Sequence, residues 1–151
     1  MNSQDILWKI IHERDVTKFD RIIPLLHEIG LENKPEVRDL NDYSISPQSP
    51  YLIYATTRKT AAILKRAGYN NPYANEYPWA RLDKETLRNK IIEKVRERKY
   101  EFFGDLPDEL RILGCGQRHE IKIIEDNITT RHYKPLLEET IRLTLKLLGE
   151  N

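Results

Sequence analysis

The chain has 151 residues, of which 39% are hydrophobic and 32% are charged, and its formal net charge is +1. This composition is typical of a charge-rich globular domain and argues against a disordered chain. No apolar run approaches the roughly 18 residues that a membrane-spanning helix needs, and the N-terminus lacks the pattern of a secretory signal. The single cysteine, Cys115, cannot form an internal disulfide, which agrees with a reducing compartment. We therefore expect one cytoplasmic domain over residues 1–151 with no membrane partner.

Residues 1–40 have the pattern of a helical hairpin. The first predicted helix covers about residues 4–14, with Ser3 as its cap and an apolar stripe at helical spacing. The second predicted helix ends at Gly30, a residue that often terminates helices. Pro24 lies in the middle of the second pattern, so we expect the helix either to kink there or to begin afresh.

The next segment contains the best candidate for a linker. Residues 41–50 are rich in turn formers and polar side chains, and we expect them to connect two parts of the chain. The apolar residues 51–55 fit either a short buried strand or the opening of the next helix. A helix is well signalled from about residue 57 to 67, because a threonine precedes its apolar face and Gly68 follows it.

The C-terminal half is also mainly helical in its pattern. Asp83 is the predicted cap of a long basic helix that runs to about Phe103. Within residues 104–151, two apolar runs separated by glycines fit either a small β-hairpin or, over residues 118–126, a helix. A final helix is predicted over residues 130–148. The fold class is therefore mainly α, with about five helices and at most a small β-hairpin.

Charge is segregated along this sequence. Residues 1–57 carry six Lys or Arg against nine Asp or Glu, residues 58–99 carry twelve against five, and residues 100–151 carry seven against ten. The central segment therefore has a net charge of +7, whereas each end has a net charge of −3. A basic block binds polyanions because its contacts with phosphates release condensed counterions. The pattern favours nucleic acid as a partner of the central segment.

Residues 51–103 contain the pattern of a helix-turn-helix. Residues 59–67 would form the bracing helix, and Gly68 would supply the tight turn because it adopts positive φ without a steric cost. Asn71 would cap a second short helix, with Pro72 at the first helical position, where its missing N–H is not needed. In such motifs the second helix presents its N-terminal residues to the major groove.

This geometry predicts two kinds of DNA contact. Asparagine side chains can recognise adenine through paired hydrogen bonds, whereas basic side chains hold phosphates and position the protein. The alternative is a corner at which the tyrosines simply pack against core helices. The predicted groove-facing residues are Asn70, Asn71, Tyr73 and Asn75, and the predicted phosphate-contacting residues are Arg58, Lys59, Lys65, Arg66, Arg81, Lys84 and Arg88.

The stretch "AAILKRAGYNNPYANEYPWARLDKETLRNKIIE" resembles the helix-turn-helix segment of phage small terminase subunits. The resemblance covers about 35 residues, less than a quarter of the chain. It departs from the family in Pro78, which shortens the second helix, and in the roughly fifty residues that precede it. It implies DNA binding and a homo-oligomer, with DNA packaging as one setting. The residues that carry it are Ala61, Ala62, Ala67, Gly68, Tyr69, Ala74, Arg81 and Leu82.

A second hypothesis is a small Mg²⁺-dependent nuclease. The stretch "PDELRILGCGQRHEIKII" resembles the PD-(D/E)xK pattern, with Asp108, then Glu120 and Lys122 two positions apart. In that pattern two carboxylates hold Mg²⁺ and the lysine positions the attacking water. The same three-residue form recurs at Glu32–Lys34, as the charge-rich composition allows. Magnesium is expected only under this hypothesis, and the DNA-binding hypothesis needs no cofactor.

Two further hypotheses remain open. Residues 51–69 as a strand and helix, followed by a late strand that carries Glu120, loosely resemble ADP-ribosyltransferases, in which this glutamate would be the catalytic acid. The other hypothesis is a non-enzymatic protein-interaction module whose acidic ends meet a partner. Salt-dependent retention of DNA would separate the DNA-binding hypothesis from the interaction module.

Overall fold

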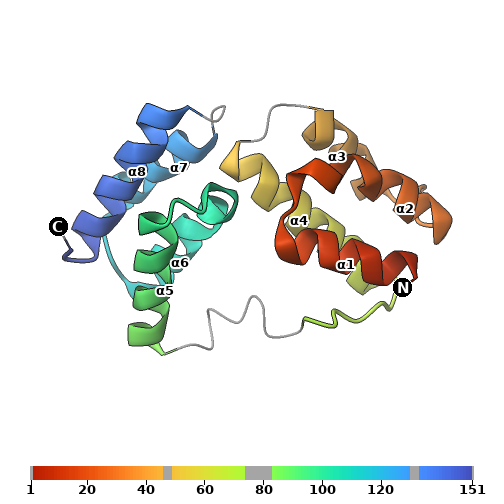
Figure 1. Cartoon of the computed structure of the whole chain (residues 1–151), viewed down its shortest axis with the longest axis horizontal. Helices are drawn as coiled ribbons and strands as arrows, with labels where there is room; N and C mark the ends of the chain where they lie inside the picture. Colours follow the sequence, from red (N-terminus) through yellow and green to blue (C-terminus); the bar gives the residue numbers. More distant parts are fainter. Residues whose placement is uncertain (1, 46–48, 74–82, 130–132, 151) are drawn as a thin grey trace. The chain divides into compact units, whose positions relative to one another are not determined.

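The computed structural model describes residues 2–45, 49–73, 83–129 and 133–150. Within these residues the chain forms eight α-helices and two 3-10 helices, and it contains no β-strand (Figure 1). The predicted mainly α class is confirmed. The helices are shorter and more numerous than the predicted five, and the small β-hairpin is wrong. None of the helices in the described part of the chain combines the length and the apolar character needed to cross a membrane.

The chain is organised as two compact units. Residues 1–48 and 55–76 form one unit, here called the N-terminal unit, and residues 49–54 and 77–151 form the C-terminal unit. Helix α4 (Pro50–Arg66) contributes its first residues to the C-terminal unit and the rest to the N-terminal unit. Residues 51–55 are therefore helical, which decides between the two alternatives drawn from the sequence. That the whole chain is one domain stays a prediction.

The N-terminal unit begins with α1 (Ser3–Glu13), which packs against α2 (Ile22–Glu28). Asn2 caps α1, because its side-chain oxygen accepts a hydrogen bond of 3.0 Å from the Asp5 N–H, so the prediction that Ser3 is the cap is wrong. Pro24 stands in the first turn of α2, where a proline N–H is not needed, and the helix begins afresh there. The helices of this unit, besides the main part of α4, are α1 (Ser3–Glu13), the 3-10 helix η1 (Val16–Arg21), α2 (Ile22–Glu28) and α3 (Pro35–Ile45).

Helix α3 occupies half of the predicted linker. It begins at Pro35, a residue suited to the first helical position, and it continues to Ile45, so residues 41–45 are helical rather than loop. Val37 and Leu40 are buried, and this burial supports the helix against the weak propensity of its polar second half. Residues 46–48 lie outside the described residues.

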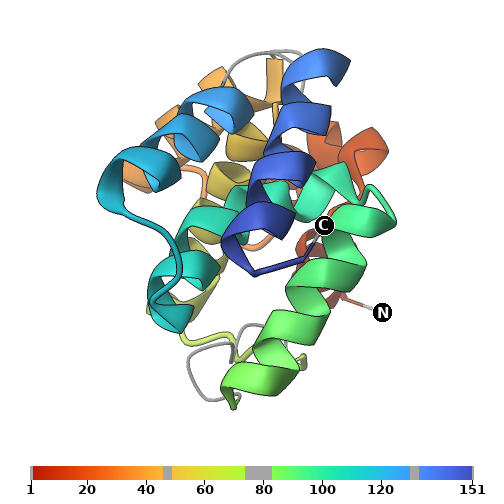
Figure 2. The same cartoon turned by 90° about the vertical axis from the view of Figure 1, so that its left-hand side faces the viewer.

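The C-terminal unit is built around four helices, of which each packs against two others. Helix α5 contacts α6, α6 contacts α7, α7 contacts α8, and α8 returns to α5, so that the ring of contacts closes (Figure 2). Their ranges, with that of the connecting 3-10 helix, are α5 (Lys84–Arg96), η2 (Tyr100–Asp105), α6 (Leu106–Leu113), α7 (Arg118–Thr129) and α8 (Lys134–Leu147).

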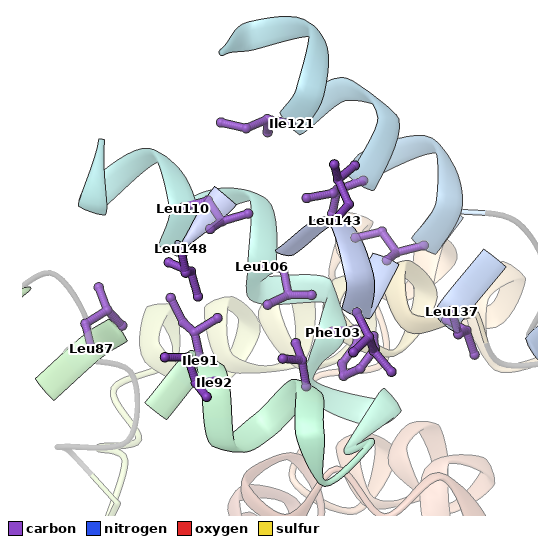
Figure 3. Packing of buried hydrophobic residues seen from close by; sticks show 14 residues of the cluster. Leu87, Ile91, Ile92, Phe103, Leu106, Leu110, Ile121, Leu137, Leu143 and Leu148 are labelled. Carbon is purple, nitrogen blue, oxygen red and sulfur yellow. The ribbon is translucent and has the colours of Figure 1, made fainter. Parts of the chain in front are cut away.

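Apolar side chains from these helices form one continuous core. Figure 3 shows that they converge from all four helices, with the Phe103 ring contributed by η2. Burying a side chain of this size stabilises the fold by roughly 1.5–3 kcal/mol before entropy is counted. The labelled members are Leu87, Ile91, Ile92, Phe103, Leu106, Leu110, Ile121, Leu137, Leu143 and Leu148.

The predicted long basic helix is broken. Asp83 caps α5 as predicted, since its carboxylate accepts a hydrogen bond of 2.8 Å from the Thr86 N–H. This bond, with a second one from the Thr86 hydroxyl, lowers the pKa of Asp83. The helix ends at Arg96, because Arg98 adopts a left-handed conformation with φ of 55°. In that conformation the guanidinium of Arg98 forms two hydrogen bonds, of 2.8 and 3.0 Å, with the carboxylate of Glu138. The predicted helix therefore stops at Arg96, and the turn that follows is linked to α8 by the bonds between Arg98 and Glu138.

The region predicted as a small hairpin consists of two helices. Leu106 and Leu110, and then Ile121, Ile124 and Ile128, are buried at intervals of three and four residues, which is helical spacing rather than the alternation of strands. The helical alternative for residues 118–126 is therefore confirmed as part of α7. Helix α8 begins at Lys134, and residues 130–132 of the predicted last helix lie outside the described residues.

Candidate nucleic-acid interface

The basic residues of α4 share one face of the helix. At 100° per residue, Arg58, Lys59, Lys65 and Arg66 fall within about 120° of one another around the axis, over a length of about 12 Å. Arg58, Lys65 and Arg66 are exposed and Lys59 is half-buried. The pairs Arg58–Lys59 and Lys65–Arg66, which are separated in the sequence, therefore lie along one side of α4. These four residues are called the basic stripe below.

The opposite face of α4 is buried. Thr56, Thr60, Ile63 and Leu64 are each 2% exposed or less, and they lie on the side of the helix away from the basic stripe. The Thr60 hydroxyl donates a hydrogen bond of 2.8 Å to the Thr56 carbonyl, so a polar group is satisfied within the helix itself. This burial fixes the rotation of α4 and keeps the basic stripe directed outward.

Carboxylates of α3 pair with one edge of the basic stripe. The Lys59 Nζ lies 3.0 Å from an Asp39 carboxylate oxygen, and Arg66 pairs with Glu36. The two acids are three residues apart, so they share a face of α3. The Arg66 side chain nevertheless remains 71% exposed. In the sequence, only the acidic character of residues 1–57 points toward such pairs.

The turn after α4 has the geometry that the helix-turn-helix pattern predicts as far as residue 73. Gly68 adopts φ of 90°, which allows the Tyr69 N–H to bond back to the Leu64 carbonyl at 3.0 Å. The Asn71 side-chain oxygen accepts a hydrogen bond of 2.8 Å from the Tyr73 N–H, as a cap would. Asn70 is exposed. The predicted second helix begins at Pro72, and its residues from 74 onward lie outside the described residues, as do Asn75 and Arg81.

The ring of Tyr73 is engaged within the N-terminal unit. It stacks on the His12 ring of α1, with centroids 3.9 Å apart and planes 9° from parallel. The predicted placement of this side chain at a DNA groove therefore finds no support in the geometry. The packed-corner alternative describes Tyr73 better, since its ring anchors the turn to α1.

The two predicted phosphate contacts on α5 belong to the C-terminal unit, and they differ from each other. Lys84 is exposed at the first position of α5. The Arg88 guanidinium instead bonds the Leu148 carbonyl, at 2.9 and 3.3 Å, and lies 3.7 Å from Glu150. Arg88 thus satisfies a carbonyl at the end of α8, where a cation is favourable. Its role in the structure is to hold the C-terminus on α5.

The three predicted nuclease residues do not line one site, because Asp108 and Lys122 border a common cavity and Glu120 does not. Glu120 and Lys122 lie two positions apart on α7, so they point about 200° apart around a helix rather than to one face as on a strand. Glu120 accepts a hydrogen bond of 2.7 Å from the Gln117 N–H at the start of α7. Lys122 pairs with Asp126 at 2.9 Å, which raises the pKa of the lysine. Asp108 bonds the Tyr54 hydroxyl at 2.7 Å.

The geometry adds no support to either enzymatic hypothesis. In the described ranges, no group of three or more His, Cys, Asp or Glu side chains is arranged to hold a metal ion. The two predicted strands of the ADP-ribosyltransferase hypothesis are helical, in α4 and α7. The sequence reasoning also missed a cavity beside Asp108 and Lys122, because its walls come from segments that are distant in the chain.

Comparison with protein-family models, curated proteins and solved structures gave no match to this chain. The resemblance to phage small terminase subunits therefore stays a prediction from about thirty-five residues of sequence.

Proposed function

We propose that the chain binds double-stranded DNA through the outward face of α4 and the turn that follows it. The observation that carries this proposal is the basic stripe of α4, which is held outward by a buried opposite face. Arg58 and Lys65 lie at the edge of the stripe away from the acids of α3, and both are exposed. They would contact phosphates together with Lys59 and Arg66, the last two when the DNA displaces Asp39 and Glu36.

The turn supports duplex DNA rather than an arbitrary polyanion. Asn70 is exposed directly beyond the basic stripe, and Asn71 caps the start of the next segment. An exposed amide at this position suits the reading of base edges beside the phosphate contacts. The resemblance to small terminase subunits favours the same arrangement. It also supports a homo-oligomer, with DNA packaging as one setting, and the single cysteine agrees with action in the cytoplasm.

A salt titration tests the proposal. Affinity for a mixed-sequence 30-base-pair duplex is measured by fluorescence anisotropy at several NaCl concentrations, for the wild type and for Arg58→Gln/Lys65→Gln. Each lost phosphate contact reduces the slope of log K against log[salt] by about 0.9, so the double variant should lose about 1.8. The matched control is Lys134→Gln/Lys146→Gln on α8, which removes the same charge from two other exposed positions. Equal slopes for all three proteins would refute the proposal.

A second variant should move the affinity in the opposite direction. Glu36→Gln removes the carboxylate that pairs with Arg66 while it keeps the size of the side chain. Because exposed ion pairs contribute roughly 0.2–1 kcal/mol, DNA affinity should rise by up to about fivefold. Glu139→Gln on α8 makes the same charge change elsewhere and controls for net charge. An unchanged affinity in Glu36→Gln would show that Arg66 does not reach the DNA.

A further inference from the structure

The C-terminal unit contains a cavity that the proposed function does not use. Its volume is about 400 Å³, within the range of small-ligand sites. Tyr51 and Tyr54 of α4 form one wall, and side chains of α6 and α7 form the others. The two tyrosine rings lie 6.5 Å apart between centroids, and Tyr51 is 42% exposed. An aromatic wall is therefore open to a ligand from solvent.

Gly104 allows α4 to approach closely enough to form this wall. A Cβ atom at residue 104 would overlap with the Tyr54 Cβ and would stand 2.7 Å from the Pro50 carbonyl oxygen. Glycine is thus the residue that lets the first turns of α4 lie on η2. The Tyr54 hydroxyl then donates its hydrogen bond of 2.7 Å to Asp108 on α6. The cavity is consequently built by packing and not by a mobile surface loop.

The charged groups of the cavity have a surplus of one carboxylate. Asp108, Glu125 and Asp126 face two cations, Arg111 and Lys122. Arg111 pairs with Glu125 and lies 3.5 Å from Asp108, so one guanidinium serves two carboxylates. Lys122 pairs with Asp126 at 2.9 Å. Both cations are therefore already engaged, and the negative charge is only partly compensated.

These features favour a cation as the ligand. The faces of tyrosine rings attract cations through the ring quadrupole, and carboxylates complete the site with charge-assisted hydrogen bonds. An anion would instead meet the surplus carboxylate and would have to displace existing ion pairs. A neighbouring hollow, in which Arg118 and His119 join Arg111 and Lys122, is basic and offers phosphate a competing place. Phosphate is therefore the appropriate counter-test.

We propose that this cavity binds an organic cation, namely a guanidinium or alkylammonium group, between Tyr51, Tyr54 and the carboxylates of Asp108 and Glu125. The protein itself contains an example of this interaction, because the Arg111 guanidinium already bridges the carboxylates of Asp108 and Glu125. The ligand guanidinium would take over these carboxylates while its alkyl chain lies against the tyrosine rings. The site is separate from the basic stripe of α4.

Titrations followed by amide NMR test the proposal. The probes are butylguanidinium, the neutral and equally shaped butylurea, and inorganic phosphate, each added to the full-length protein. Butylguanidinium should give saturable shifts at amides of α6 and α7 that line the cavity, and butylurea should give none. Saturable shifts at the cavity with butylurea, or with phosphate alone, would overturn the proposal.

Variants distinguish the cation site from a nonspecific attraction. Glu125→Gln should weaken the binding of butylguanidinium, whereas Glu139→Gln, with the same loss of charge on α8, should leave it unchanged. Arg111→Gln removes the internal competitor and should strengthen binding by about two- to fivefold, the equivalent of an exposed ion pair. Weaker or equal binding in Arg111→Gln would overturn the proposal. Dispersed amide spectra confirm that each variant is folded.

Discussion

Gly104→Ala tests the close approach of α4 to η2 on which the cavity depends. The added methyl group would meet the Tyr54 Cβ, the Tyr54 Cγ at 3.0 Å and the Pro50 carbonyl oxygen at 2.7 Å. The Pro50 carbonyl oxygen belongs to the backbone, and the Tyr54 Cβ is attached directly to it, so neither atom can rotate away from the added methyl group. The helix must move as a whole, or the contact must open.

The cost follows from two opposing effects. Overpacking of a well-packed site costs roughly 1–3 kcal/mol, and rigid neighbours place this site near the upper end. Replacing glycine with alanine also restricts the unfolded chain, which recovers roughly 0.4–1 kcal/mol. The net loss is therefore about 2 kcal/mol, which corresponds to a fall in Tm of about 4–8 °C for a protein of this size.

Thermal unfolding followed by circular dichroism measures this loss. A double-mutant cycle with Tyr54→Gly isolates the contact, because that variant removes the atom nearest to the new methyl group. Gly104→Ala should then cost less by about 1 kcal/mol or more, within the range of coupling energies between neighbours. If Gly104→Ala leaves Tm unchanged, or costs the same in both backgrounds, α4 does not lie on η2 as described.

Two further predictions concern ion pairs of the C-terminal unit. Lys94 and Glu109 form a pair with side chains only 11% and 8% exposed. Lys94→Met should cost roughly 3 kcal/mol in urea unfolding, because it removes a cation from beside a buried carboxylate. Adding Glu109→Met should recover at least half of that cost. Arg98 lowers the pKa of Glu138 from its ordinary 4.5, so the stabilisation is present above that value and is lost as the pH falls through the lowered pKa. The stability difference between wild type and Glu138→Gln should accordingly vanish in strong acid, and a difference that persists there would contradict this origin.

The elements that local sequence determines were predicted well. Gly68 follows the end of α4, Asn71 accepts a cap-like hydrogen bond from the Tyr73 N–H, and Asp83 caps α5, because this backbone and side-chain chemistry acts within a few residues. The apolar runs near Leu110 and Ile121 were less clear, because four or five apolar residues suit a strand as well as a helix. Only their packing against the rest of the four-helix core decides between the two.

Local sequence patterns did not predict contacts between residues that are distant in the chain. Helix α5 ends shortly before the left-handed Arg98, whose guanidinium bonds Glu138, forty residues later in the chain. Likewise, the segregation of charge did not reveal that Glu36 and Asp39 would neutralise part of the basic stripe. A count of Lys and Arg along the sequence measures charge, whereas binding depends on which of those charges still face solvent after the protein has paired them.

This pairing limits how strongly DNA binding by the α4 stripe can respond to salt. Four phosphate contacts would give a slope of about −3.6, whereas contacts from Arg58 and Lys65 alone would give about −1.8. A phosphate that reaches Lys59 or Arg66 must first release a carboxylate of α3, and the freed carboxylate then gathers cations from solution. This uptake offsets the counterions that the phosphate releases, so we expect the wild-type slope to be shallower than −3.6. Removing both acids in Glu36→Gln/Asp39→Asn should then steepen it toward −3.6, and a slope that does not change would mean that this edge of α4 never meets the DNA.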